Sequence, residues 1–316
     1  MTNLWVPPDN NLAIEIKNLS KIYKNSDSVH PALNNISLKI KCGSFFGLLG
    51  PNGAGKSTLI NIIAGTTIKS EGNVKIWDLD IDRFRKQSKL AVGVVPQELN
   101  IDAFFTPVDQ LELQAGLFGV PKNKRITSKI LDLMDLTSKS NAYSRNLSGG
   151  MRRRLLVAKA MVHNPPILIL DEPTAGVDVE LRKKLWQNFK ELNDIGVTII
   201  LTTHYLEEAE NLCNEIAIIH KGKIAAQGQK NQLLSKIDQK ILIINFQKKI
   251  EEKLKKEVMT FGEVDFNNQS CNIKYKPSKV TINDVFEFFR SKGIKILDIK
   301  TRDITLEDVF LMLTKD

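Results

Sequence analysis

The chain has 316 residues, of which 42% are apolar and 26% are charged. This length predicts two folded units, and the composition excludes a disordered or collagen-like protein. The 45 Lys and Arg outnumber the 36 Asp and Glu, which gives a net charge of +9. Such an excess favours a nucleic acid or an anionic membrane face when it is concentrated, but here it is spread along the chain. No nucleic-acid partner is therefore expected.

Signals for membrane insertion and secretion are weak in this sequence. No stretch approaches the roughly 18 consecutive apolar residues that a spanning helix needs, so the chain is not expected to cross a membrane by itself. Residues 1–10 have neither the basic start nor the apolar segment of a secretory signal. Cys42, Cys213 and Cys271 are far apart and lack metal-ligand spacing, which is typical of reduced thiols in a cytosolic chain.

The first elements in chain order are strands. Alternating apolar residues predict two strands between residues 11 and 40, and the apolar run at 44–49 predicts a buried parallel strand that leads into the glycine-rich segment 50–58. A helix should begin near Lys56 and end near Gly65. The next expected elements are strands at 73–77 and 92–95 and helices at 109–118 and 127–135.

Two short apolar and β-branched runs follow, at 167–170 and 197–201, with a helical pattern at 179–192 between them. This order is typical of a βαβ unit and predicts a parallel sheet. A hairpin at 216–219 and 224–226 and a short helix at 229–236 complete a first domain, which we place at residues 12–236.

Residues 237–316 predict a separate, small α+β domain. Their order is βαββαβ followed by a terminal helix from Leu306. The expected strands are 241–246, 263–267, 271–275 and 294–299, and the expected helices are 249–258 and 282–292. This segment contains no glycine-rich loop and no clustered His or Cys, so no role is indicated for it.

A phosphate-binding pattern, G-x-x-x-x-G-K-[ST], follows the buried strand. Its residues are Gly50, Pro51, Asn52, Gly53, Ala54, Gly55, Lys56 and Ser57, with Thr58 next. Glycines let backbone N–H groups point at phosphate oxygens where a Cβ would obstruct them. Lys56 would neutralise the β- and γ-phosphates, and the Ser57 hydroxyl would bind Mg²⁺.

Two acids, Asp171 and Glu172, end the apolar strand at 167–170. Behind a phosphate loop, Asp171 can hold a magnesium-bound water and Glu172 can activate the attacking water. The alternative is a strand that ends in two solvated acids.

The segment Ser148, Gly149 and Gly150 is suited to the N-terminus of a helix, where free N–H groups and the positive dipole end favour an anion. A lone Ser-Gly-Gly is often just a loop. Its position between the phosphate loop and Asp171 makes a binding role the preferred interpretation.

These motifs together resemble the ATP-binding subunits of ABC transporters over residues 12–236. In this resemblance 50–57 is Walker A, 147–151 is the signature motif, 167–171 is Walker B and 175–178 is the D-loop. The fold implied is a P-loop NTPase of the α/β class, with a parallel-sheet core, an antiparallel β subdomain and a helical subdomain. Single residues with implied roles are the adenine-stacking Tyr23, the Q-loop Gln97, the catalytic Glu172, the D-loop Asp178 and the switch histidine His204.

The signature ends in Met151, where many relatives have glutamine, so one polar contact is absent. The run of Met151, three arginines and a leucine resembles the ABC-2 type exporters, which include drug and antibiotic resistance ATPases. The segment Thr305–Phe310 resembles the closing helix of those subunits.

The resemblance implies ATP and Mg²⁺ as cofactors, with Ser57, Gln97 and Asp171 near the metal. It also implies a head-to-tail homodimer, in which the Walker A loop of one protomer and Ser148–Gly150 of the other enclose each ATP. A separate integral-membrane permease would bind near Gln97, which would place the subunit at the cytoplasmic face of the inner or plasma membrane.

Three other functions are weighed against this one. A soluble ABC ATPase that acts on ribosomes or nucleic acid would have two fused cassettes or a long coiled-coil insertion, and this chain has one phosphate loop and no such insertion. An importer ATPase would carry a small barrel as its accessory domain. A nucleotide kinase would need neither the signature nor the switch histidine.

Overall fold

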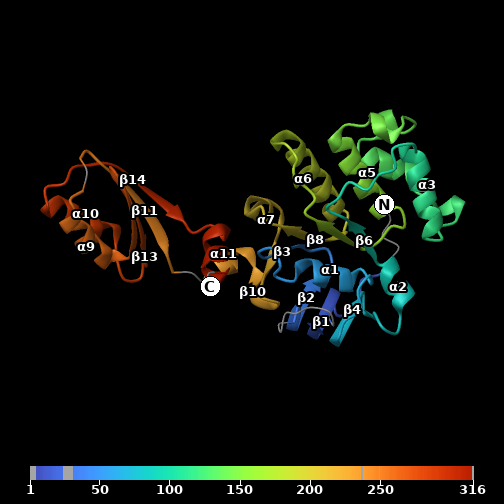
Figure 1. The fold of residues 1–316 in the computed structure, drawn as a ribbon, viewed down its shortest axis with the longest axis horizontal. Coiled ribbons are helices and arrows are strands. Elements are labelled where there is room, and N and C mark those ends of the chain that lie inside the picture. Colours follow the sequence, from blue (N-terminus) through green and yellow to red (C-terminus); the bar gives the residue numbers. More distant parts are fainter. Residues whose placement is uncertain (1–4, 24–30, 236–237, 249, 315–316) are drawn as a thin grey trace. The chain divides into compact units, whose positions relative to one another are not determined.

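The computed structural model describes residues 5–23, 31–235, 238–248 and 250–314. The chain divides into two compact units, Met1–Lys230 and Asn231–Asp316 (Figure 1). The boundary expected between residues 236 and 237 falls shortly after this division, and both of these residues lie outside the described ranges.

A six-stranded sheet in the order β10-β9-β3-β8-β7-β6 forms the centre of the first unit. All neighbouring strands are parallel except β9 and β10, which are antiparallel. Every residue of β3 and β8 is buried, which fits the apolar run of β3 and the β-branched residues of β8. The bounds are β3 Phe45–Leu49, β6 Val92–Val95, β7 Ile167–Asp171, β8 Thr198–Thr203, β9 Glu215–His220 and β10 Lys223–Gln229. The predicted parallel sheet is confirmed.

A second, antiparallel sheet has the order β2-β1-β4-β5 (blue to cyan in Figure 1). Ile14 pairs with Ile40 and Ile16 with Leu38, and these side chains join a buried core that also contains Leu59 and Ile60. The bounds are β1 Leu12–Lys21, β2 Leu33–Lys41, β4 Glu71–Ile76 and β5 Leu79–Asp80. The alternation of the sequence therefore predicts the buried face of this sheet correctly.

The helices of the first unit include a group, α3, α4 and α5, whose members contact one another (green in Figure 1). Thr106 caps α3 in a capping box with Asp109, and Pro107 occupies the first turn. The α-helices are α1 Lys56–Ile63, α2 Arg85–Leu90, α3 Pro107–Leu117, α4 Thr127–Leu133, α5 Gly149–Met161, α6 Val179–Asp194, α7 Leu206–Leu212 and α8 Lys230–Ser235, the last continuing into the second unit. Short 3₁₀ turns span η1 Lys122–Lys124, η2 Thr137–Lys139 and η3 Ser144–Asn146.

The second unit contains an antiparallel sheet in the order β12-β13-β11-β14. Its core includes Leu242 and Ile244 of the sheet and Phe289 of α10. The expected start of its first helix, Lys249, lies outside the described residues. The bounds are β11 Lys240–Phe246, α9 Glu252–Val258, η4 Met259–Phe261, β12 Glu263–Asn267, β13 Ser270–Tyr275, α10 Ile282–Ser291, β14 Ile296–Asp303 and α11 Leu306–Thr314.

One partly buried histidine makes the stability of the first unit depend on pH. The ring of His163 stacks on Phe118 with centroids 3.8 Å apart, and its Nε2 lies 3.2 Å from the carbonyl oxygen of Val92. Burial lowers the pKa of His163 from its usual 6.5 to about 4, although the hydrogen bond to Val92 acts in the opposite direction. The unfolded chain thus binds a proton that the folded chain does not, between about pH 6.5 and pH 4.

We expect the free energy of unfolding to fall by about 2 kcal/mol between pH 7 and pH 5 through this histidine. The loss begins as the pH drops through the unfolded pKa and is complete below the folded one. Urea unfolding followed by tryptophan fluorescence measures it, because Trp5, Trp77 and Trp186 all lie in the first unit. In His163→Phe the same pH step should change stability less, and an unchanged pH dependence in that variant would contradict the assignment.

Candidate functional site

The loop between β3 and α1 requires glycine at two positions. A Cβ on Gly50 would lie 2.4 Å from the carbonyl oxygen of Ile219. Gly55 has a φ of +110°, and a Cβ there would lie 2.7 Å from the carbonyl oxygen of Ala32. L-amino acids with side chains avoid both the conformation and the contact. The loop is therefore shaped as a cradle of backbone groups at the N-terminus of α1.

Lys56 lies across this loop. Its Nζ donates hydrogen bonds to the carbonyl oxygens of Gly50 at 2.7 Å and Pro51 at 3.1 Å, and the residue is only 7% exposed. Burial lowers the pKa of Lys56, while the nearby Glu172 and Asp171 favour its charged form. The ammonium group is thus held beside the loop and close to two carboxylates.

Tyr23 follows β1 and lies at the edge of the same loop. Its hydroxyl donates to Oγ1 of Thr58 over 3.5 Å, and Nζ of Lys21 lies 4.8 Å from the centre of its ring. The side chain remains 43% exposed. A partly exposed aromatic ring therefore flanks the segment that carries Ser57 and Thr58.

Asp171 and Glu172 are fixed by Thr202 of the neighbouring strand β8. The Thr202 hydroxyl donates to Oδ1 of Asp171 at 2.5 Å, and the backbone N–H of Glu172 donates to the carbonyl oxygen of Thr202 at 3.0 Å. Glu172 has a φ of +46°, a left-handed conformation that costs about 1 kcal/mol for a residue with a side chain. The chain turns sharply here, immediately after β7 ends.

The carboxylate of Glu172 brings together residues from three strand ends. Its Oε2 accepts a hydrogen bond from Nε2 of Gln97 at 3.1 Å and lies 3.2 Å from Nδ1 of His204. Gln97 follows β6, Glu172 follows β7 and His204 follows β8. These are the carboxyl ends of parallel strands, where open α/β sheets place their ligands.

Ser148 begins α5. Its side chain accepts a hydrogen bond from the N–H of Met151 at 3.2 Å, as expected of an N-cap. A Cβ on Gly150 would lie 2.3 Å from Cδ1 of Leu181 in α6, so the start of α5 lies directly on α6. Asp178 caps that second helix by accepting from the N–H of Leu181 at 2.9 Å.

The capping residues form a group apart from the phosphate loop. Within the described ranges, no hydrogen bond or ion pair joins Ser148, Gly149, Gly150 or Asp178 to the loop. The structure therefore brings Lys56, Gln97, Asp171, Glu172 and His204 together. The starts of α5 and α6, with Ser148 and Asp178, form a separate group.

Comparison with known proteins identifies the family. The ABC transporter family model matches residues 33–175. A Nod factor export ATP-binding protein I of Ralstonia nicotianae is 34% identical over 311 residues, which cover 95% of this chain and 93% of that protein. The chain belongs to the ATP-binding subunits of ABC transporters.

Two other relatives of this ABC subunit are named as export and resistance ATP-binding proteins. The Nod factor export ATP-binding protein I of Cupriavidus metallidurans is 39% identical over 70% of this chain and 72% of its own length. A linearmycin resistance ATP-binding protein of Bacillus subtilis is 31% identical over 95% of this chain and 98% of its own. The ABC-2 exporter type expected from the sequence is thereby confirmed.

Solved ABC cassettes have the same fold. A dimeric, post-hydrolysis cassette with bound ADP and phosphate, MJ0796, has a TM-score of 0.60 and 28% identity, covering 68% of this chain and 98% of that one. The ATP-binding subunit of an ABC transporter has a TM-score of 0.62 and 26% identity, covering 71% and 92%. The chain is an ATPase with the P-loop fold expected from its motifs.

Two residues of this ABC site are not identified from the sequence. Thr202 is visible only as part of the Thr202–His204 segment, and Arg153 only as one of three consecutive arginines. Arg153 is buried in α5, and its Nη1 donates to the carbonyl oxygens of Pro96 at 3.2 Å and Gln97 at 2.8 Å. The signature helix thus binds the backbone of the Q-loop.

We expect Arg153→Met to lower both stability and ATP turnover. Loss of two charge-assisted hydrogen bonds from a buried guanidinium should reduce the free energy of unfolding by about 2 kcal/mol and release the backbone at Gln97. Arg152→Met is the matched control because Arg152 is exposed on the same helix. Thermal unfolding and steady-state ATP hydrolysis measure the two effects, and equal behaviour of the two variants would contradict this role of Arg153.

Proposed function

We propose that the loop residues 50–58 bind the phosphates of ATP, with Lys56 beside the β- and γ-phosphates and Tyr23 against the adenine. The cradle of backbone N–H groups at the start of α1 and the ring at its edge support this assignment. The member residues are Gly50, Pro51, Asn52, Gly53, Ala54, Gly55, Lys56, Ser57 and Thr58.

We propose Glu172 as the general base of hydrolysis and His204 as the group that orients it. The observation that carries this proposal is that Oε2 of Glu172 lies within hydrogen-bond reach of both Gln97 and His204. A carboxylate held in this way can accept a proton from a water that attacks the γ-phosphate. Substitution of Glu172 by Gln, described in the Discussion, tests the assignment.

The residues that would hold Mg²⁺ offer the hard oxygen ligands that this ion prefers: the Ser57 hydroxyl, the Asp171 carboxylate and the Gln97 amide oxygen. Thr202 holds the Asp171 carboxylate in place, and because Nε2 of Gln97 donates to Glu172, its amide oxygen remains for a cation. When bound, the ion would neutralise charge on the phosphate oxygens.

We propose that a second copy of the chain completes each site. Ser148, Gly149 and Gly150 present the N-terminus of a 13-residue helix, and Ser148 and Gly149 are exposed. Such a terminus attracts phosphate, yet this one is not bonded to the phosphate loop of its own chain. A head-to-tail dimer would supply it, together with Asp178, to the ATP held by the partner.

We propose further that the subunit drives a separate integral-membrane permease from the cytoplasmic face of the inner or plasma membrane. Among the described residues, no helix is both long and apolar enough to traverse a bilayer. Large apolar side chains are exposed close to the Q-loop and on the approach to α2; Phe104 is 72% exposed, Phe105 41% and Phe84 45%. Exposed aromatic side chains of this kind favour a protein partner.

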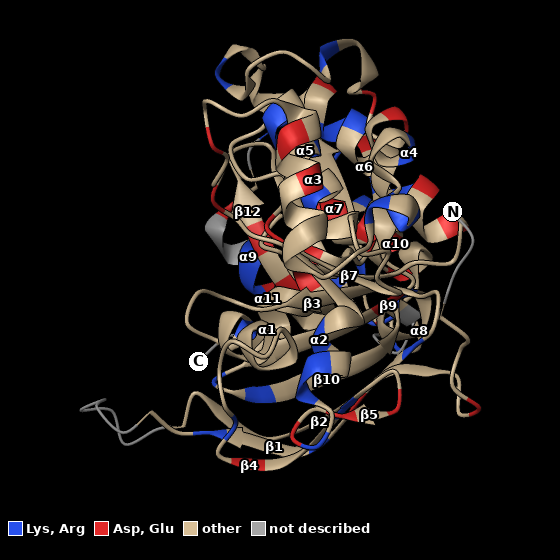
Figure 2. Ribbon diagram, turned by 90° about the vertical axis from the view of Figure 1, so that its right-hand side faces the viewer, with Lys and Arg blue, Asp and Glu red and all other residues tan. Residues whose placement is uncertain are grey.

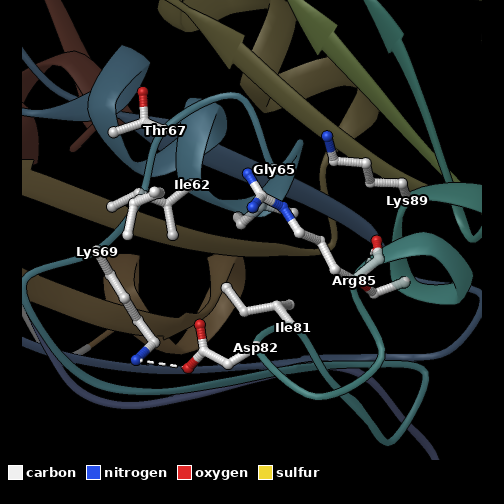
Figure 3. A pocket seen from close by; sticks show the side chains of 11 residues that line it. Ile62, Gly65, Thr67, Lys69, Ile81, Asp82, Arg85 and Lys89 are labelled. Carbon is white, nitrogen blue, oxygen red and sulfur yellow. Dashed lines mark hydrogen bonds and ion pairs between the residues drawn. The ribbon is translucent and has the colours of Figure 1, made fainter.

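A pocket between α1 and α2 is a further candidate contact for the permease, and Phe84 directly precedes its lining residue Arg85 in the chain (Figure 3). Ile62 and Ile81 supply apolar walls, while Arg85 and Lys89 extend from α2 at its rim. Lys69 is paired with Asp82 at 2.9 Å. Figure 2 shows α2 as a basic segment, which favours an acidic loop or helix of the permease as the group bound here.

Purification from solubilised membranes tests the permease assignment. A hydrophobic protein of several spans should accompany the subunit, and Arg85→Glu with Lys89→Glu should weaken that association without changing ATP binding. The control is Lys276→Glu with Lys279→Glu, because both lysines are exposed on the second unit. Recovery with ribosomes, nucleic acid or no partner would favour a soluble ABC ATPase instead.

A further inference from the structure

One buried carboxylate takes no part in the mechanism above. Glu208 lies in α7 and is 1% exposed. Its Oε1 accepts a hydrogen bond from Oγ1 of Thr174 at 3.0 Å and another from Nε1 of Trp186 at 3.0 Å. Burial of a carboxyl group is costly unless it is hydrogen-bonded, so three buried or partly buried polar groups depend on one another here.

The partners of Glu208 belong to the segments that carry the catalytic groups. Thr174 is fully buried two residues after Glu172, in a turn closed by hydrogen bonds from Ala175 N–H to Glu172 and from Val177 N–H to Thr174. The helix α7, which carries Glu208, begins two residues after His204. Burial raises the pKa of Glu208, and its hydrogen bonds from Trp186 and Thr174 oppose that shift.

The other hydrogen-bond partner, Trp186, links the Glu208 carboxylate to the D-loop helix. Trp186 lies on α6, whose first turn is capped by Asp178. Arg182 of the same helix lies over the ring of Tyr205, 4.9 Å from its centre, which adds a second contact between α6 and the segment after His204. The side chain of Glu208 therefore joins the turn after Glu172 to the D-loop helix, and Glu208 itself belongs to the helix that follows His204.

We propose that Glu208 is a positioning residue, which holds the turn after Glu172 against α7, the helix that follows His204. It does not touch ATP. It acts by keeping the Glu172 carboxylate and the His204 ring close together. The inference rests on the roles proposed above for Glu172 and His204.

The test uses the full-length chain and separates positioning from stability. Thr174→Val keeps the volume of the side chain and removes its hydrogen bond to Glu208, while Thr174→Ser keeps the hydroxyl. Trp186→Phe removes a bond of the same length to the same oxygen from the α6 side. We measure kcat and KM for ATP, and thermal unfolding by circular dichroism.

Thr174→Val should lower kcat about tenfold, equivalent to about 1.4 kcal/mol of activation free energy, with KM within about twofold of the original chain. Thr174→Ser should restore kcat, and Trp186→Phe should lower the unfolding temperature with little change in kcat. Unchanged kcat in Thr174→Val, or an equal loss in Trp186→Phe, overturns the proposal because Glu208 then only stabilises the fold. Glu172→Gln is assayed in parallel; if that variant still hydrolyses ATP, the proposed catalytic roles fail, and Glu208 loses its function with them.

Discussion

Glu172→Gln is expected to bind ATP normally, to hydrolyse it at least about 100-fold more slowly, and to accumulate as a dimer. The amide can still form hydrogen bonds with Gln97 and His204, so the local structure should persist. It cannot accept the proton of the attacking water. Gel filtration with MgATP and with MgADP measures the dimer, and release of phosphate measures turnover.

Glu180→Gln is the control for this substitution, because Glu180 is exposed on α6 and, among the residues that the structure describes, its carboxylate pairs only with Lys184. It should behave as the unaltered chain does. A Glu172→Gln protein that remains monomeric with MgATP would argue against nucleotide-driven closure, and one that hydrolyses ATP normally would exclude Glu172 as the base.

Ser148→Arg is expected to abolish hydrolysis without weakening the binding of ATP to the single chain. Ser148 is exposed at the N-terminus of α5, where its hydroxyl caps the helix. An arginine removes that cap, places a cation at the positive end of the helix dipole and fills the space that the partner's phosphates would enter. Ser138→Arg introduces the same side chain at another exposed position of the first unit and should leave ATP binding and hydrolysis unchanged.

Mixing tests whether the site is shared between chains. Ser148→Arg and Lys56→Ala should each be inactive alone. In a mixed dimer, however, the phosphate loop of the Ser148→Arg chain and the signature motif of the Lys56→Ala chain form one intact site. Random pairing at equal concentrations should restore up to about a quarter of the original sites. A mixture that is no more active than its separate components would argue that each chain carries a complete site.

The long and regular elements of the fold are predictable from the sequence. The strand at 92–95 has the bounds expected of it, because a short, valine-rich run that ends at a proline is typical of a buried strand. The helices α2 and α7 are not predicted. They have six and seven residues, and neither has a side-chain N-cap, so their formation depends on tertiary contacts rather than local signals.

The site is predictable only in part. The motifs indicate Lys56, Asp171, Glu172, Gln97 and His204, but nothing in the order of the residues indicates that Glu172 accepts a hydrogen bond from Gln97 and lies 3.2 Å from His204. The roles of Arg153 and Glu208 are not predictable from the sequence at all. Their charges are typical of exposed helix positions, and only the three-dimensional structure shows that they are buried against backbone carbonyls and hydroxyls.

The contact of Gly150 with Leu181 has a mechanical consequence. A methyl group at position 150 would lie 2.3 Å from Cδ1 of Leu181, so a residue larger than glycine fits only if the leucine side chain moves. Gly150→Ala should consequently displace that side chain and disturb the first turn of α6, which Asp178 caps. A spectroscopic label at the start of α6 would report this change.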